Sequence, residues 1–480
     1  MKRGAFFSFR RFSMNSLFCA MIFSTLVSCR KVEVERKSDN AESLQAELER
    51  QKNSAIEEYI LSLSECERLA QIFVVNIEGN EEFCFCEYMD DGSEKKSPLI
   101  PGGYIFFSFN IAETPEKIAA FTDSVRRFAH EKKRAEPFLC LDAEGGFVNR
   151  LRGLAGPLPE ATRVSECLDA SQAERLYSLN AIQLKSLGFD LNFAPVCETL
   201  TLANEKFLEG RSFGEAKAAS EYSCAAIKSY QQNRVGAVAK HFPGNGNADP
   251  HARIPRVFFE ADDFQKNVLD PFEKILDENP TGILMSHAFV ELGENNGTDF
   301  SESDEFPASL SAFWIEKILR EKLGFDGIVF SDDIFMSALE QSGFDSEQAV
   351  REAILAGVNC ILMSEKRFLR EYEIVRKFYL EDAAFRSRVD DSVRKIVKFK
   401  INCGILHYEY AESQETETNS ASRMKIVSSE LFSENENCEN SFSKRMEEFS
   451  AAKKENIALY EKYFLPTASK EELRAVRWTR

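Results

Sequence analysis

Short apolar runs rich in Val, Ile and Phe recur along most of the chain. Each has the length of a single strand and is nearly continuous in its apolar character. Continuous runs of this kind predict strands that are buried on both faces. The runs occupy residues 70–77, 104–111, 137–142, 189–196, 235–240, 281–290, 325–333 and 357–364.

Amphipathic helical patterns fill the intervals between these runs. In residues 115–133 a proline stands in the first turn, and Ile118, Phe121 and Val125 repeat at threes and fours on one face. Residues 309–325 show the same spacing. Buried strands that alternate with such helices predict a parallel sheet covered by helices. Eight strands favour an α/β fold of the (β/α)8 TIM-like barrel type over an open sheet.

Charged and polar side chains follow these strands at the end where such barrels carry out their chemistry. Because an unpaired charge is costly to bury, charges placed after so many apolar strands indicate a shared site. The residues concerned are Asp142, Arg150, Arg211, Lys240, His241, Asp332 and Asp333.

Each of these residues also has an ordinary structural interpretation. Asp142 and Asp332 could cap helices, which is a common role of Asp after a strand. Lys240 and His241 could form a polar pair at the barrel rim, and Phe335 is expected in the core. The functional interpretation therefore depends on whether the charged residues share one cavity.

The stretch "KHFPGNGNADPH" (240–251) holds two of the chain's five histidines in one glycine-rich loop. A histidine titrates near neutral pH, and Asp249 could hold the ring of His251 and stabilise its imidazolium form. The glycines would let the loop fold over a substrate. Retaining glycoside hydrolysis needs such a proton donor together with a carboxylate nucleophile, and Asp332 at a strand end is suited to the second role.

Several motifs stand in order at the predicted strand ends: "LDAEGG" (141–146), "GRSFG" (210–214), "KHFPGNGNADPH", "FSDDIFM" (330–336) and "PASLSAFWIEKILREKLGFDGIVFSDD" (307–333). Together they resemble glycoside hydrolase family 3, in its β-N-acetylhexosaminidase branch. The resemblance runs from about residue 55 to residue 406. It implies a single catalytic barrel domain over 55–406, without a complete second domain.

By matching position, the resemblance implies Asp332 as nucleophile, His251 as acid/base and Asp249 as the partner of His251. The family's usual substrate class is β-linked N-acetylglucosamine, often attached to muramic acid in peptidoglycan fragments. The resemblance thus implies a retaining, exo-acting β-N-acetylglucosaminidase that forms a glycosyl-enzyme intermediate and needs no metal or organic cofactor. The residues that it implies for holding the sugar hydroxyls and N-acetyl group are Asp142, Arg150, Arg211, Lys240 and His241.

The chain departs from the family's pattern in two motifs. Phe147 replaces an arginine of the family's "EGGRVQR", and Asn245 replaces a histidine of its "PGHG". The loop before Asp249 is about two residues short, and Pro250 fixes its own φ and restricts the residue before it. These departures bear on rate and specificity more than on the class of reaction.

Two other functions are compatible with the same residues. A phosphorylase would pass the glycosyl enzyme to phosphate in place of water, and phosphate dependence of the product would distinguish it. A sugar-binding lipoprotein without turnover is compatible with the altered loop. A binding protein, however, has no need of Asp332, Asp249 and His251 together.

The first 29 residues indicate an export signal. A basic start precedes an apolar run over 16–27 that is too short to span a membrane. Cys29 follows "LVS", a permissive form of the bacterial lipobox, so we predict a lipid on Cys29 and a membrane-anchored protein that faces the periplasm or the cell exterior. An ordinary signal and a short buried helix are the alternatives. Residues 30–54 are charged and poor in aromatic residues, which predicts a solvated tether.

Charge and composition exclude some classes of binding partner. A formal net charge of -18 argues against nucleic acid, because phosphate binding needs a basic face. Cys84 and Cys86 lack the two-residue gap of a zinc knuckle, so we predict no structural metal. The tail 407–480 is too short for a second domain and is expected to be an acidic linker followed by a helical or disordered segment. The expected partner is a glycan, bound by a monomer.

Overall fold

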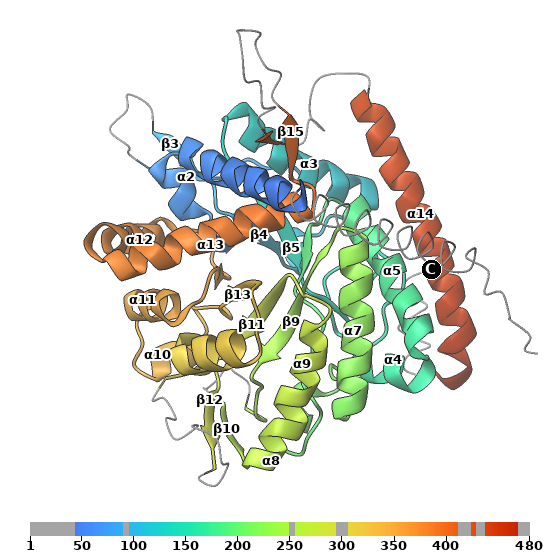
Figure 1. The fold of residues 1–480 in the computed structure, drawn as a ribbon. Coiled ribbons are helices and arrows are strands. Elements are labelled where there is room, and N and C mark those ends of the chain that lie inside the picture. Colours follow the sequence, from blue (N-terminus) through green and yellow to red (C-terminus); the bar gives the residue numbers. More distant parts are fainter. Residues whose placement is uncertain are drawn as a thin grey trace, which may run out of the picture.

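A nearly closed barrel of eight parallel strands stands at the centre of the protein, with helices around it (Figure 1). The computed structural model describes residues 44–89, 96–248, 255–293, 306–410, 424–428 and 437–468. The barrel strands are β1 (Phe73–Asn76), β4 (Gly103–Phe106), β5 (Phe138–Leu141), β8 (Leu191–Asn192), β9 (Gly236–Phe242), β11 (Gly282–Met285), β13 (Ile328–Phe330) and β14 (Ile361–Met363). Their order is β13-β11-β9-β8-β5-β4-β1-β14, and a bridge between Phe330 and Cys360 joins the two end strands.

The predicted strands are confirmed, each at its expected place, and every residue of these eight strands is buried. Glycines at two strand starts make room for large rings. A Cβ at Gly103 would lie 2.4 Å from the ring of Phe138, and a Cβ at Gly282 would lie 2.5 Å from the ring of Phe330. Apolar runs with glycine at such points therefore specify a closely packed interior.

Helices surround the barrel as the amphipathic patterns predict. The helix expected over 115–133 begins at Pro115, where the Thr114 side chain accepts a hydrogen bond from the backbone of Lys117. The segment 309–325 contains a π-helix, η4, with its predicted apolar stripe buried. The helices that surround the barrel or lie in its loops are α2 (Glu65–Ala70), η1 (Ser108–Asn110), α3 (Pro115–Glu131), α4 (Ala161–Cys167), α5 (Ala170–Ser186), α6 (Glu205–Leu208), α7 (Ala216–Gln232), α8 (Ala261–Phe264), η2 (Gln265–Leu269), α9 (Asp270–Leu276), η3 (Ala308–Leu310), η4 (Phe313–Lys322), α10 (Ser337–Gln341), α11 (Ser346–Ala356), α12 (Leu369–Glu381) and α13 (Ala383–Asn402).

The segment expected to be a solvated tether is partly helical. Residues 44–54 of the predicted tether belong to a helix that continues to residue 62. Ile56 and Ile60 are buried, and Glu57 pairs with Arg394 of α13 at 2.5 Å. These contacts order the helix, and its polar first turns extend from that anchored part. The signal peptide, Cys29 and the first part of the tether lie outside the described residues.

The tail beyond the barrel forms two further elements. Strand β15 (Leu406–Tyr410) pairs antiparallel with β16 (Met424–Ser428), a pairing that the sequence did not predict. Helix α14 (Asn437–Tyr463) runs along α5 (Figure 1). Glu455 pairs with Arg175, and Lys453 donates to the carbonyl of Leu154 at 2.8 Å. Helix α14 thus lies in the part of the tail that was expected to be helical or disordered, whereas most of the predicted linker lies outside the described residues.

Within the described ranges, no helix combines the length and the apolar character that crossing a bilayer requires.

Candidate active site

Five side chains form a charged network at the carboxyl ends of β5 and β9: Arg150, Asp142, Lys240, Glu144 and Arg211. The Nζ atom of Lys240 lies at its centre, 2.9 Å from Asp142 Oδ1 and 2.6 Å from Glu144 Oε1. Arg150 donates to Asp142 at 3.0 Å. Arg211 donates to Glu144 through two N–H groups, at 2.8 and 2.9 Å. The four predicted residues of this network therefore do share one site, and Glu144 joins them.

The local backbone explains why Arg150 returns to Asp142. After β5 the chain turns through a short hairpin of β6 (Ala143–Gly145) and β7 (Val148–Asn149). Gly145 and Gly146 have φ values of 117° and 53°, a region that favours glycine. A Cβ at Gly145 would also lie 2.1 Å from the carbonyl oxygen of Pro159. The glycines of "LDAEGG" thus allow the tight turn that brings both ends of the hairpin to one place.

Charge pairing overcomes the cost of burial in this network. Burial alone would raise the pKa of Asp142, but Lys240 and Arg150 lower it below its usual value. The pKa of Glu144 is lowered in the same way by Lys240 and Arg211. Burial would lower the pKa of Lys240, yet the two carboxylates raise it. The two carboxylates and Lys240 are therefore charged at neutral pH, and with the two guanidinium groups three cations face two carboxylates.

His241 is held by a second buried carboxylate, Glu198, which follows β8. The Nδ1 atom of His241 lies 2.6 Å from Glu198 Oε1, and the backbone N–H of Asn245 donates to Glu198 Oε2 at 2.6 Å. Because a carboxylate accepts here, Nδ1 carries the proton and Nε2 is left for other contacts. Burial would raise the pKa of Glu198, but the hydrogen bonds from His241 and Asn245 lower it.

Asp332, the predicted nucleophile, follows β13 and is partly buried. The backbone N–H of Asp333 donates to Asp332 Oδ1 at 2.9 Å. His287, which follows β11, donates from Nε2 to the carbonyl of Asp333 at 3.0 Å and accepts at Nδ1 from the hydroxyl of Ser309. Among the described residues, no cation forms an ion pair with the Asp332 carboxylate. The Asp333 N–H therefore holds this carboxylate in place, and no cation of the described residues pairs with it.

Asp249 and His251, the predicted acid/base pair, lie outside the described residues. The chain on either side of them is well anchored. Asn247 donates to the carbonyl of Leu202 at 2.9 Å and accepts from the backbone of Lys206 at 2.8 Å. On the far side, β10 (Arg256–Phe259) pairs in parallel with β12 (Phe289–Leu292).

The structure decides between several earlier interpretations. Asp142 and Lys240 form an ion pair within the charged network. A helix cap does not account for the contacts of Asp142, and a polar pair with His241 alone does not account for those of Lys240. Phe335 is 36% exposed, so its predicted place in the core is wrong. It stands in the loop between β13 and α10, close after Asp332. Phe147, the residue that departs from the family's pattern, is 84% exposed on the β6–β7 turn.

Three residues of the site were missed by the sequence analysis: Glu144, Glu198 and His287. Glu198 is the first charged residue after β8, so the rule that identified Asp142 after β5 would also have found it. Glu144 stands within a quoted motif. His287 closely follows β11 in a segment that was read only as apolar.

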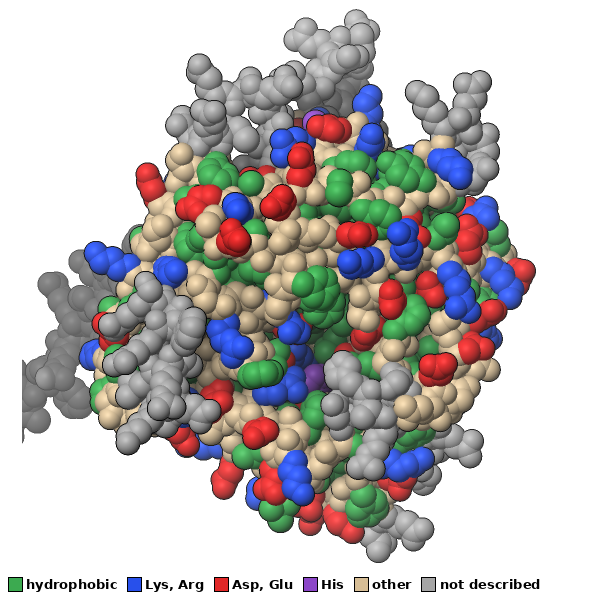
Figure 2. Space-filling model, turned by 180° about the vertical axis from the view of Figure 1, so that it is seen from behind, with side chains coloured by type: hydrophobic (Ala, Val, Ile, Leu, Met, Phe, Trp, Pro, Cys, Tyr) green, Lys and Arg blue, Asp and Glu red, His purple; other side chains and the backbone are tan. Residues whose placement is uncertain are grey.

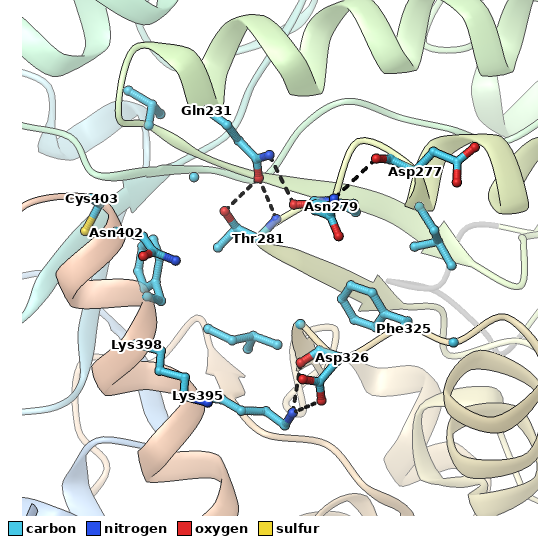
Figure 3. A pocket seen from close by; sticks show the side chains of 18 of the residues that line it. Gln231, Asp277, Asn279, Thr281, Phe325, Asp326, Lys395, Lys398, Asn402 and Cys403 are labelled. Atoms are coloured by element: carbon cyan, nitrogen blue, oxygen red, sulfur yellow. Dashed lines mark hydrogen bonds and ion pairs between the residues drawn. The ribbon is translucent and has the colours of Figure 1, made fainter. Parts of the chain in front are cut away.

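The face shown in Figure 2 has a hollow near its centre, with a histidine side chain visible in it and Lys and Arg side chains beside it. A second hollow, of about 710 Å³, lies at the opposite end of the barrel, where Gly236, Thr281 and Ile328 mark strand starts (Figure 3). Its polar groups largely pair with one another, as Gln231 does with Thr281 and Lys395 with Asp326. Within the described ranges, no group of three or more His, Cys, Asp and Glu side chains is arranged to hold a metal ion.

The Glycosyl hydrolase family 3 N terminal domain matches residues 93–399, which is more than half of the chain. The chain belongs to this family. As a family 3 protein it is a glycoside hydrolase, and the charged network lies within the matched residues.

Curated relatives and solved structures agree with this assignment. A β-hexosaminidase of Haemophilus influenzae is 31% identical over 278 residues, which cover 56% of this chain and 74% of that protein. A β-hexosaminidase of Methylobacillus flagellatus is 29% identical over 277 residues, with coverage of 56% and 74%. The fold is similar to a family 3 β-N-acetylglucosaminidase from Paenibacillus sp. (TM-score 0.59, 23% identity, 81% of this chain and 69% of that one). It is also similar to the β-N-acetylglucosaminidase from Thermotoga maritima (TM-score 0.56, 24% identity, 73% and 74%).

Proposed function

We propose that this family 3 glycoside hydrolase is a retaining, exo-acting β-N-acetylglucosaminidase. The observation that carries the proposal is that the charged network and the carboxylate of Asp332 stand at one barrel mouth, and that no cation of the described part of the chain pairs with this carboxylate. The network offers charged donors and acceptors for the hydroxyl groups of one sugar ring, and Asp332 offers a nucleophile. The name β-hexosaminidase, carried by the curated relatives, supports an N-acetylhexosamine as that ring.

The reaction that we propose has two steps. The Asp332 carboxylate attacks C1 of the sugar and forms a glycosyl ester, while His251, supported by Asp249, gives its proton to the departing oxygen. Water then attacks C1, His251 takes a proton from it, and the ester bond to Asp332 breaks. Configuration at C1 is inverted twice and so retained. Within the described residues no cation pairs with Asp332, which suits it to the first attack, because an ion pair would lower its nucleophilicity.

Terminal β-linked N-acetylglucosamine in peptidoglycan fragments is the substrate that we propose, on the family resemblance. We further propose that the protein acts outside the cytoplasmic membrane, attached through a lipid on Cys29. The apolar run over 16–27 and the "LVSC" sequence support this location.

The test is release of 4-nitrophenol from its β-N-acetylglucosaminide by the chain without residues 1–29, with the β-glucoside as the control substrate. We expect activity on the acetamido sugar only, and a loss of at least about 1000-fold in kcat for Asp332→Ala, because the covalent step is removed. The matched control is Glu205→Gln on the exposed face of α6, which should leave the rate unchanged. Equal activity of Asp332→Ala would rule out Asp332 as nucleophile, and a product that becomes a sugar phosphate when phosphate is added would indicate a phosphorylase.

A further inference from the structure

The tail helix α14 packs one face along α5 (Figure 1). Phe449, Ala452, Asn456 and Tyr460 follow one another at intervals of three and four residues, and all four side chains are buried. The helix lies beyond residues 93–399, the part of the chain that matches the family's domain. Its buried face therefore invites the question of what it does for the site.

Two residues of α14 hold the loop that follows the β6–β7 hairpin. The Nζ atom of Lys453 donates to the carbonyl of Leu154 at 2.8 Å. Gly156 lets the loop approach Asn456 closely, because a Cβ at this glycine would lie 2.5 Å from Asn456 Oδ1. The Gly156 N–H also donates to Gln183 Oε1 on α5 at 2.7 Å. The loop is therefore fixed between α5 and α14.

This loop is a tight turn that begins directly after Arg150. The backbone N–H groups of Leu154 and Ala155 donate to the carbonyl of Leu151 at 2.9 and 3.0 Å. The side chains of Leu151 and Leu154 are buried. A shift of Leu154 therefore moves Leu151, and with it the backbone from which the Arg150 side chain extends.

Arg150 depends on its backbone more than Arg211 does. Within the described residues, the guanidinium of Arg150 makes one hydrogen bond, to Asp142 at 3.0 Å, and the ring centroid of Phe107 lies 5.4 Å away. Arg211 instead donates two N–H groups to Glu144. Two parallel bonds fix the orientation of a guanidinium, whereas one bond leaves it free to turn. The place of the Arg150 backbone therefore decides where its guanidinium lies.

We propose that Lys453 is a positioning residue for substrate binding, through which α14 acts on Arg150. The ammonium group holds Leu154 against α14, the turn passes this restraint to the Arg150 backbone, and the guanidinium stays where it meets the sugar. The inference rests on the proposed function, since it concerns a residue that is proposed to hold the sugar. It gives a helix outside the matched domain a role in the reaction.

The experiment measures KM and kcat for the 4-nitrophenyl β-N-acetylglucosaminide. We expect Lys453→Met to raise KM about threefold to fivefold and to keep kcat within about twofold of the wild-type value, because one hydrogen bond to the loop is lost while the reacting groups are untouched. Lys453→Arg keeps a charged donor at this place and should return KM to near the wild-type value. Lys454→Met, the same substitution at the next and exposed residue of α14, is the matched control and should keep the wild-type KM.

Two further variants separate positioning from general stabilisation. Arg150→Ala should itself raise KM, and Lys453→Met should have no further effect when added to it, because the lysine acts through the arginine. Glu455→Gln removes the ion pair with Arg175 and weakens the attachment of α14 to α5 without a change at the loop. It should keep the wild-type KM even where it lowers the midpoint of thermal unfolding.

The outcomes distinguish the inference from the proposed function. If the wild-type protein cleaves the glycoside and Lys453→Met has the same KM, the inference is refuted while the proposed function stands. The inference is also refuted if Lys453→Met raises KM by the same factor with and without Arg150→Ala. If the wild-type protein does not cleave the glycoside, the proposed function fails, and the inference fails with it.

Discussion

Glu198 fixes two parts of the site with one carboxylate. It accepts from the Nδ1–H of His241 and from the backbone N–H of Asn245, at 2.6 Å in both cases. The first bond sets the tautomer of His241 and directs Nε2 away from Glu198. The second fixes the start of the loop that leads to Asp249. Loss of the negative charge should therefore disturb the position of His241 and the loop together.

We expect Glu198→Gln to lower kcat/KM for the acetamido substrate about tenfold, because two charge-assisted hydrogen bonds become weaker neutral ones. The test is to measure steady-state kinetics and the midpoint of thermal unfolding for each variant. Glu205→Gln, the same substitution at an exposed position on the same β8–α7 connection, serves as the control. Unchanged kinetics in Glu198→Gln would mean that His241 keeps its place without the carboxylate.

Helix α13 is attached to the opposite end of the barrel by a buried lysine. The Nζ atom of Lys400 donates to Gln71 Oε1 at 2.6 Å and to the carbonyl of Glu136 at 2.5 Å. Burial lowers the pKa of Lys400 from 10.5 to about 8. Between those two pH values the unfolded chain binds more protons at this position than the folded chain does. The free energy of unfolding therefore rises with pH across this window.

The lysine should contribute a rise of about 3 kcal/mol in the free energy of unfolding between about pH 8 and about pH 10.5. Lys400→Met removes this contribution and should show a flatter dependence on pH over the same window. Urea denaturation of both proteins at several pH values measures the difference between them, so that other titrating groups cancel. Parallel curves for the two proteins would show that Lys400 titrates normally in the folded state.

At the scale of the whole molecule, we propose that the first residues determine the location of the protein. If Cys29 carries the lipid, the full-length protein should be recovered in the membrane fraction of the producing bacterium, because the acyl chains partition into the bilayer. Cys29→Ser should shift the protein to the soluble fraction and prevent incorporation of a labelled fatty acid. A membrane-bound, unlabelled Cys29→Ser protein would argue for another mode of attachment.

The sequence predicted the barrel well because each strand is a continuous apolar run with a recognisable helix after it. Because the strand ends converge, the sequence also predicted that four charged residues lie in one site: Asp142, Arg150, Arg211 and Lys240. Other features depend on long-range contacts that no local pattern shows. Ile56 and Ile60 order a helix that the charged composition of its start argued against, and β15 pairs with a segment 14 or more residues away in sequence.

The central claim is that Asp332 forms a covalent bond to an N-acetylglucosaminyl group, and trapping that ester tests it most directly. A slow 5-fluoro-N-acetylglucosaminyl fluoride would be incubated with the chain that lacks residues 1–29, and the labelled peptide would be identified by mass spectrometry. We expect one added sugar on the peptide that contains Asp332, and none when the Asp332→Ala protein is treated in the same way. Inactivation without a label on Asp332, or a label on another carboxylate, would contradict the account.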